Sequence, residues 1–138
     1  MKCLGMDLGT KTLGLATSDK LGIISSPYKV LRYEDVNKLV DEVVNIIKEL
    51  KIEVLVLGYP KNMNNSLGEA VNRTMHFKEL LEEKVDMEIN LIDERLSTVE
   101  AENYLIGEDM RREKRKEIID AVAASIILDT YLRMKKEN

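Results

Sequence analysis

Short, mostly apolar segments separated by polar turn residues make up the first part of the chain, a pattern typical of β-strands. The pattern predicts three strands, at residues 2–8, 12–18 and 23–31, joined by two short turns. Two tight connections between consecutive strands are typical of an antiparallel meander. Pro27 interrupts the third strand. Because proline has no N–H to donate to a neighbouring strand, we expect this strand at an edge of the sheet.

The pattern then changes to the helical period, with short apolar segments between the helices. Asp35 can cap a helix over residues 36–50, where apolar residues recur every three or four positions. Residues 53–57 are nearly all apolar, which is typical of a parallel strand buried on both faces. Further elements are predicted at residues 66–84 (helix), 87–92 (strand), 97–106 (helix), 107–116 (mobile loop) and 117–134 (helix).

This order of elements predicts a single domain of the α/β class over residues 1–138. A meander followed by two strand–helix crossovers builds a mixed five-stranded sheet, with three antiparallel and two parallel strands and helices on both faces. The order is that of the RNase H-like architecture. A flavodoxin-like sheet would need helices between the first three strands, and the chain leaves no room for them.

Composition also indicates where in the cell the protein is located. Hydrophobic residues make up 44% and charged residues 33% of the chain, which is typical of a globular protein. No apolar run approaches the ~20 residues that a membrane helix needs, so no membrane association is expected. Asp7 stands where a signal peptide would be apolar, and Cys3 is the single cysteine. We therefore expect a cytoplasmic protein.

Charge gives a mixed indication about nucleic-acid binding. The formal net charge of −4 argues against a polyanionic ligand, although acids that hold divalent cations would weaken that argument. Five basic residues fall between positions 111 and 116. Such a run is more often a solvated helix entrance than a phosphate contact.

Acidic residues stand at the ends of apolar segments. Asp7 lies near the end of the first predicted strand, Asp93 and Glu94 follow the last one, and Asp120 lies close to the start of the final helix. In open α/β sheets the functional crevice lies outside the carboxyl ends of the strands. We therefore expect these acids to meet at one rim of the sheet.

Carboxylates gathered in this way favour a divalent cation. They repel one another and are costly to bury, whereas Mg²⁺ prefers oxygen ligands and commonly bridges carboxylates and phosphates. The chemistry that follows is phosphodiester hydrolysis with Mg²⁺, for which Mn²⁺ is an alternative ion. Taken singly, each acid has a simpler explanation: Asp7 as a turn former, Asp93 as a partner of Arg95, and Asp120 as a helix cap. Only the set favours a metal site.

Four segments carry a family resemblance. Residues 7–16 read DLGTKTLGLA, residues 58–68 read GYPKNMNNSLG, residues 93–98 read DERLST, and residues 119–128 read IDAVAASIIL. In this order and spacing they resemble the motifs of the YqgF/RuvX family and span the chain. The resemblance implies an RNase H-like fold related to RuvC-type Holliday junction resolvases. It also implies a nuclease that processes the 5′ end of pre-16S ribosomal RNA, with ribosomal particles as partners and a monomer or weak homodimer as the assembly.

The resemblance maps the acidic site of the family onto this chain. It implies Asp7, Glu94 and Asp120 as catalytic residues, and these three with Asp93 as candidate metal ligands. Analogy with the strand-end glutamate of RuvC-type enzymes favours Glu94 over Asp93, but a slip of one residue in the strand would exchange them. The residues that could contact the substrate are Gly9, Lys11, Ser66, Gly68, Arg95, Arg111, Arg112 and Arg115.

Two positions depart from the family pattern. Thr12 stands where the family commonly has arginine, which removes one expected substrate contact. Asn65 stands where glycine is usual, and asparagine tolerates the positive φ that a loop there would need. Both changes bear on substrate affinity more than on the chemistry.

Three rival functions remain open. A junction resolvase acting on branched DNA would share the fold and the metal chemistry, and its symmetric cutting would call for a two-fold dimer. An ATP-binding domain of the actin and sugar-kinase type also carries an Asp-Leu-Gly-Thr loop, but needs two domains around the nucleotide. A nucleic-acid-binding module without catalysis would have no use for the acidic set.

Overall fold

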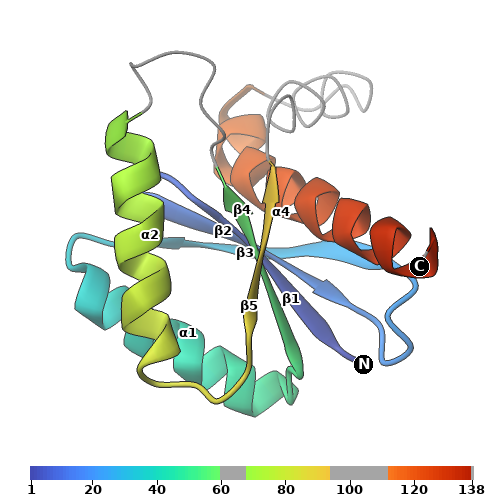
Figure 1. Cartoon of the computed structure of the whole chain (residues 1–138). Coiled ribbons are helices and arrows are strands. Elements are labelled where there is room, and N and C mark those ends of the chain that lie inside the picture. Colours follow the sequence, from blue (N-terminus) through green and yellow to red (C-terminus); the bar gives the residue numbers. More distant parts are fainter. Residues whose placement is uncertain (60–67, 94–111, 138) are drawn as a thin grey trace.

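The sheet of the computed structural model confirms the predicted order of strands (Figure 1). The structure describes residues 1–59, 68–93 and 112–137. Its five strands run in the spatial order β3-β2-β1-β4-β5. The first three pair antiparallel, and β4 and β5 run parallel to β1. The strands are β1 (Cys3–Leu8), β2 (Thr12–Ser18), β3 (Ser25–Arg32), β4 (Val54–Tyr59) and β5 (Ile89–Asp93).

Helices cover both faces of this sheet. Helices α1 (Val36–Leu50) and α2 (Gly68–Glu82) lie on one face, and α4 (Arg112–Glu137) crosses the other (Figure 1). The predicted cap of α1 is confirmed, because the Asp35 carboxylate accepts the N–H of Asn37 at 2.9 Å. The two faces thus hold separate apolar layers, and among the described helices α4 packs on the face opposite α1 and α2.

The two apolar layers differ in the size of their side chains. Leucine, isoleucine and valine side chains, with Phe77, fill the layer under α1 and α2. Under α4 small residues take part, among them Ala16 and Ala124. Large side chains hold α1 and α2 away from the sheet, whereas small ones let α4 approach it closely.

Two glycines mark the closest approach of α4 to the sheet. A Cβ atom built on Gly5 would lie 2.8 Å from the Cβ of Leu128, and one built on Gly14 would lie 2.0 Å from the carbonyl oxygen of Asp120. Real Cβ atoms do not come so close to other atoms. Glycine at position 14 is therefore required for the backbone of Asp120 to lie against β2.

The ends of several elements differ from the sequence prediction. The last helix begins at Arg112 and not at residue 117, so residues 112–116, predicted as loop, are helical. Arginine, lysine and glutamate are good helix formers, but a run of them lacks the apolar period used to locate a helix. Strand β3 begins at Ser25 because the N–H groups of Ile23 and Ile24 both donate to the Asp19 carboxylate, which extends the turn. The helix predicted at residues 97–106 lies outside the described residues.

The contact at Gly14 predicts a large loss of stability on adding one methyl group. We expect Gly14→Ala to lower the free energy of unfolding by about 1–3 kcal/mol or more, because the obstructing atoms belong to backbone and cannot rotate away. Gly68→Ala is the control, since a Cβ there would meet no atom of the described residues within 4 Å, and its effect should stay within about 0.5 kcal/mol. Urea unfolding of both variants measures the difference. Equal stability of the two would contradict the close approach of α4.

Candidate active site

Asp7 and Asp120 come together at the carboxyl end of β1. Asp7 is the cross-strand partner of Gly14 in the β1–β2 pairing. The backbone of Asp120 lies directly against Gly14, as the 2.0 Å distance to a Cβ built there shows. Both acids are half-buried. The fold therefore brings two of the predicted site residues, one from each end of the chain, to the same corner of the sheet.

The side chain of Asp7 points to the same face of the sheet as α4. Strand neighbours alternate between faces, and Met6 and Leu8 pack in the layer under α1 and α2. Cys3, which shares the parity of Asp7, packs in the layer under α4. Asp7 and Asp120 thus lie on one face of the sheet as well as at one end of it.

Thr12 ties this corner together. Its hydroxyl donates a hydrogen bond of 2.6 Å to Oδ2 of Asp120. Its carbonyl oxygen accepts the N–H of Gly9 at 2.8 Å, which closes the turn between β1 and β2. The contact between Thr12 and Asp120 was not predicted from the sequence. There, position 12 was considered only for the arginine that it lacks. Only the β1–β2 register, which faces Thr12 toward the helix, could have indicated it.

Tyr33 fixes the same turn from the side of β3. Its hydroxyl donates to the carbonyl oxygen of Gly9 at 2.6 Å, and its N–H donates to the carbonyl oxygen of Lys11 at 3.0 Å. Burial raises the pKa of the Tyr33 phenol above its ordinary value, because the charged form would lose hydration. The predicted substrate contacts Gly9 and Lys11 therefore stand on a well-anchored turn beside Asp7, with the Lys11 side chain exposed.

Asp93 occupies a different place from the pair of acids. It is the last residue of β5 and the partner of Tyr59 in β4. Ile92 packs under α4 and Ile89 packs under α1 and α2, so the alternation of the strand puts Asp93 on the α1 and α2 face. Among the described residues, no group of three or more His, Cys, Asp or Glu residues could hold a metal ion. Glu94, the predicted third catalytic acid, lies outside the described residues.

The other predicted substrate contacts are spread over the chain. Gly68 is the first residue of α2, on the face of the sheet opposite α4. Arg112 and Arg115 belong to α4, but their side chains are not among those described. Ser66, Arg95 and Arg111 lie outside the described residues. Of the eight predicted contacts, Gly9 and Lys11 are the two that the described structure puts beside the acid pair.

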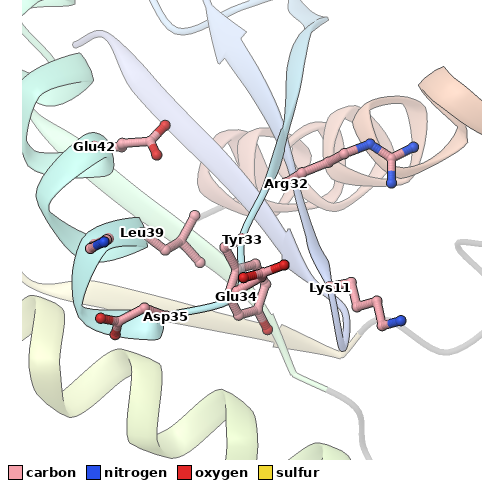
Figure 2. Close-up of a pocket in the computed structure, with 8 residues that line it drawn as sticks. Lys11, Arg32, Tyr33, Glu34, Asp35, Leu39 and Glu42 are labelled. Carbon is pink, nitrogen blue, oxygen red and sulfur yellow. The ribbon is translucent and has the colours of Figure 1, made fainter.

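A cleft of about 420 Å³ adjoins the β1–β2 turn (Figure 2). Lys11 and Arg32 form one side of it, and the acidic residues Asp35 and Glu42 lie on the side of α1. Arg32 is the cross-strand partner of Thr12, so it stands close to the acid corner. Basic and acidic groups are mixed along the cleft, and it therefore favours no single class of ligand.

Comparison with known proteins gives one family over nearly the whole chain. The family model described as "RuvX: Holliday junction resolvase" matches residues 1–134. A protein of Desulforamulus reducens named "Putative pre-16S rRNA nuclease" is 42% identical over 132 residues, which cover 96% of each chain. A protein of the same name from Ligilactobacillus salivarius is 43% identical over 137 residues, covering 97% of this chain and 93% of the relative.

Solved structures show the same fold at low sequence identity. The RuvC protein of Thermus thermophilus, solved in complex with a Holliday junction substrate, superposes with a TM-score of 0.63 at 14% identity and covers 99% of this chain and 96% of its own. The fowlpox virus resolvase, solved with Holliday junction DNA, gives 0.58 at 12% identity over 98% and 99%. The predicted RNase H-like fold is therefore confirmed.

The hydrogen bond of the Tyr33 hydroxyl predicts a pH-dependent loss of stability in Tyr33→Phe. Removing the hydroxyl leaves the Gly9 carbonyl without this donor, and we expect the free energy of unfolding at neutral pH to fall by about 1 kcal/mol. The folded state holds the phenolic proton more tightly than the unfolded state, because the folded pKa is raised. The stabilisation is therefore complete below the unfolded pKa and is lost as the pH rises through the folded pKa.

Urea unfolding of wild type and Tyr33→Phe between pH 7 and pH 11 measures this dependence. The two stability curves should converge at the alkaline end. Tyr28→Phe, which alters an exposed tyrosine of β3, is the control and should follow wild type throughout. A constant difference between wild type and Tyr33→Phe over the whole range would contradict the assignment.

Proposed function

The chain belongs to the RuvX family, and from this membership we propose that it is a metal-dependent nuclease that acts in 5′-end maturation of pre-16S ribosomal RNA. The enzyme class rests on the family and on relatives about 40% identical over nearly the whole chain. Hydrolysis of phosphodiester bonds is the chemistry that a pre-16S rRNA nuclease and a junction resolvase have in common. The observation that supports it most directly is the meeting of Asp7 and Asp120 at the carboxyl end of β1.

The donor set at this corner fits a hard divalent cation. Asp7 and Asp120 supply carboxylate oxygens, which Mg²⁺ prefers, and a divalent cation bound between two half-buried carboxylates on one face would lower their mutual repulsion. We propose Mg²⁺ as the ion, with Mn²⁺ as a substitute. When bound, such an ion activates water and stabilises the leaving oxygen of a phosphodiester.

Glu94 is our candidate for the third ligand. Asp93 is on the face of the sheet away from Asp7, so its carboxylate is not on the side where Asp7 and Asp120 would share an ion. This supports Glu94 over Asp93, in agreement with the family analogy.

The chain's own residues then orient the substrate. We propose that Lys11, which is exposed beside Asp7, contacts a phosphate of the substrate. The backbone at Gly9 allows close approach of the nucleic acid at the turn, and Tyr33 keeps that turn in position. We also propose contacts from Ser66, Gly68, Arg95, Arg111, Arg112 and Arg115, ribosomal particles as the setting, and a monomer or weak homodimer in the cytoplasm. No helix of the described residues is long and apolar enough to span a membrane.

Cleavage of branched DNA is the second candidate. The description of the family model as a Holliday junction resolvase favours it. The likeness to RuvC of Thermus thermophilus supports the shared fold alone, since identity is 14%. The names of the curated relatives favour ribosomal RNA, and we therefore take that substrate as the first choice.

Substitution of one acid tests the nuclease proposal. We expect Asp120→Asn to lower the rate of cleavage of labelled precursor 16S rRNA in Mg²⁺ by more than the ~10–100-fold that loss of an outer-shell partner of a metal commonly costs. Asp129→Asn is the matched control, because Asp129 lies on the same helix and pairs with Arg133 at 2.9 Å. A four-way DNA junction assayed in parallel separates the two substrates, and EDTA should abolish cutting of either one.

Three outcomes would count against the proposal. Equal cutting by wild type and Asp120→Asn would mean that a contaminant supplies the activity. Tight binding of RNA by wild type with no cleavage under any divalent ion would favour a binding module without catalysis. Cleavage of the junction alone would replace ribosomal RNA by branched DNA as the substrate.

A further inference from the structure

The contact between Thr12 and Asp120 joins two parts of the chain that are 108 positions apart. Its oxygen–oxygen distance of 2.6 Å is typical of a hydroxyl that donates to an ionised carboxylate. Both residues are half-buried, so water competes for the bond less than it would at the surface. The bond therefore fixes one oxygen of the proposed metal ligand Asp120.

Thr12 is itself held in place by its surroundings. Its carbonyl oxygen accepts the N–H of Gly9 at 2.8 Å, and Arg32 is its partner in the β2–β3 pairing. Threonine is branched at Cβ, which restricts rotation about χ1. The hydroxyl therefore points to Asp120 from a backbone that is anchored on both sides.

Asp120 is constrained from its other end as well. Its carbonyl oxygen lies against Gly14, so the backbone has no room to shift toward β2. With the backbone fixed and Oδ2 engaged by Thr12, rotation of the carboxylate is restricted. The bond from Thr12 engages one acceptor site of Oδ2, and an ionised carboxylate has further acceptor sites that a cation can use. The arrangement presents a carboxylate of fixed orientation on the face that Asp7 occupies.

From this geometry we propose that Thr12 is a positioning residue of the metal site, which orients Asp120 so that its carboxylate binds the cation together with Asp7. The inference rests on the proposed function, because it assigns a role within the same site. It also gives position 12 a function other than the phosphate contact of the arginine common in the family. Partners that orient a ligand commonly change metal affinity by ~10–100-fold.

A purely structural role would have different consequences. The small residues Ala16 and Ala124 and the close contacts at Gly5 and Gly14 already pack α4 on the sheet. If Thr12 merely linked the helix to β2, its removal would lower the thermal midpoint and leave the metal affinity of the folded protein unchanged. Metal affinity is therefore the measurement that separates the two roles.

Binding of Mn²⁺ to the protein without nucleic acid tests the proposal. Thr12→Val keeps the shape of the side chain and removes the hydroxyl, and we expect it to weaken Mn²⁺ binding by about 10–100-fold, measured from the electron paramagnetic resonance signal of free Mn²⁺. Thr12→Ser restores the hydroxyl and should return the affinity to within about threefold of wild type. Thr130→Val is the matched control, since the Thr130 hydroxyl donates to the carbonyl oxygen of Ile126 on the same helix.

Cleavage kinetics provide the second readout. We expect the Mg²⁺ concentration for half-maximal cleavage to rise in Thr12→Val by the same factor as the Mn²⁺ dissociation constant, and the rate at saturating Mg²⁺ to recover. Wild-type affinity in Thr12→Val, or no rescue by Thr12→Ser, would overturn the inference. If Asp120→Asn loses Mn²⁺ binding while Thr12→Val retains it, the metal site stands and only the role of Thr12 fails. If Asp120→Asn binds Mn²⁺ as wild type does, the proposed metal site itself fails.

Discussion

The close contact of α4 with β2 at Gly14 is the constraint on which the active-site corner depends. A side chain of any size at position 14 would hold the helix off the sheet by the width of a methyl group or more. At the observed distance, α4 holds Asp120 against Gly14, and Gly14 is the cross-strand neighbour of Asp7. Small residues along the rest of the interface, such as Ala16 and Ala124, allow the same approach. Packing therefore decides the geometry of the chemistry in this fold.

Electrostatics then decides what the corner can bind. Two half-buried carboxylates repel each other, and their ionised forms persist only where donors or cations compensate them. The hydroxyl of Thr12 supplies one donor to Asp120. A hard cation bound at this corner would add to the compensation and would at the same time offer a partner for a phosphate. The acidic net charge of the chain by itself argues against a nucleic-acid ligand. It is consistent with binding of a phosphate once the acids hold a metal ion, because the ion reverses the local charge.

The order of strands and helices, the position of Asp7 near the end of a strand and that of Asp120 in the last helix could be predicted from the sequence, because apolar periodicity and a carboxylate that interrupts it are local signals. The beginning of α4 could not, since residues 112–116 are polar and carry no period that separates helix from loop. The bond from Thr12 to Asp120 and the two bonds of Tyr33 depend on register and on helix packing, which join distant parts of the chain. The β4–β5 register was also needed to determine which face of the sheet Asp93 is on, since a shift of one residue would move its side chain to the other face.

A crystal of the protein soaked in Mn²⁺ would show where the metal binds, because the anomalous signal of the ion locates it without reference to activity. We expect an anomalous peak whose centre lies within about 2.5 Å of carboxylate oxygens from both Asp7 and Asp120. A peak bound elsewhere, or well-ordered carboxylates at this corner with no ion between them at saturating Mn²⁺, would contradict it.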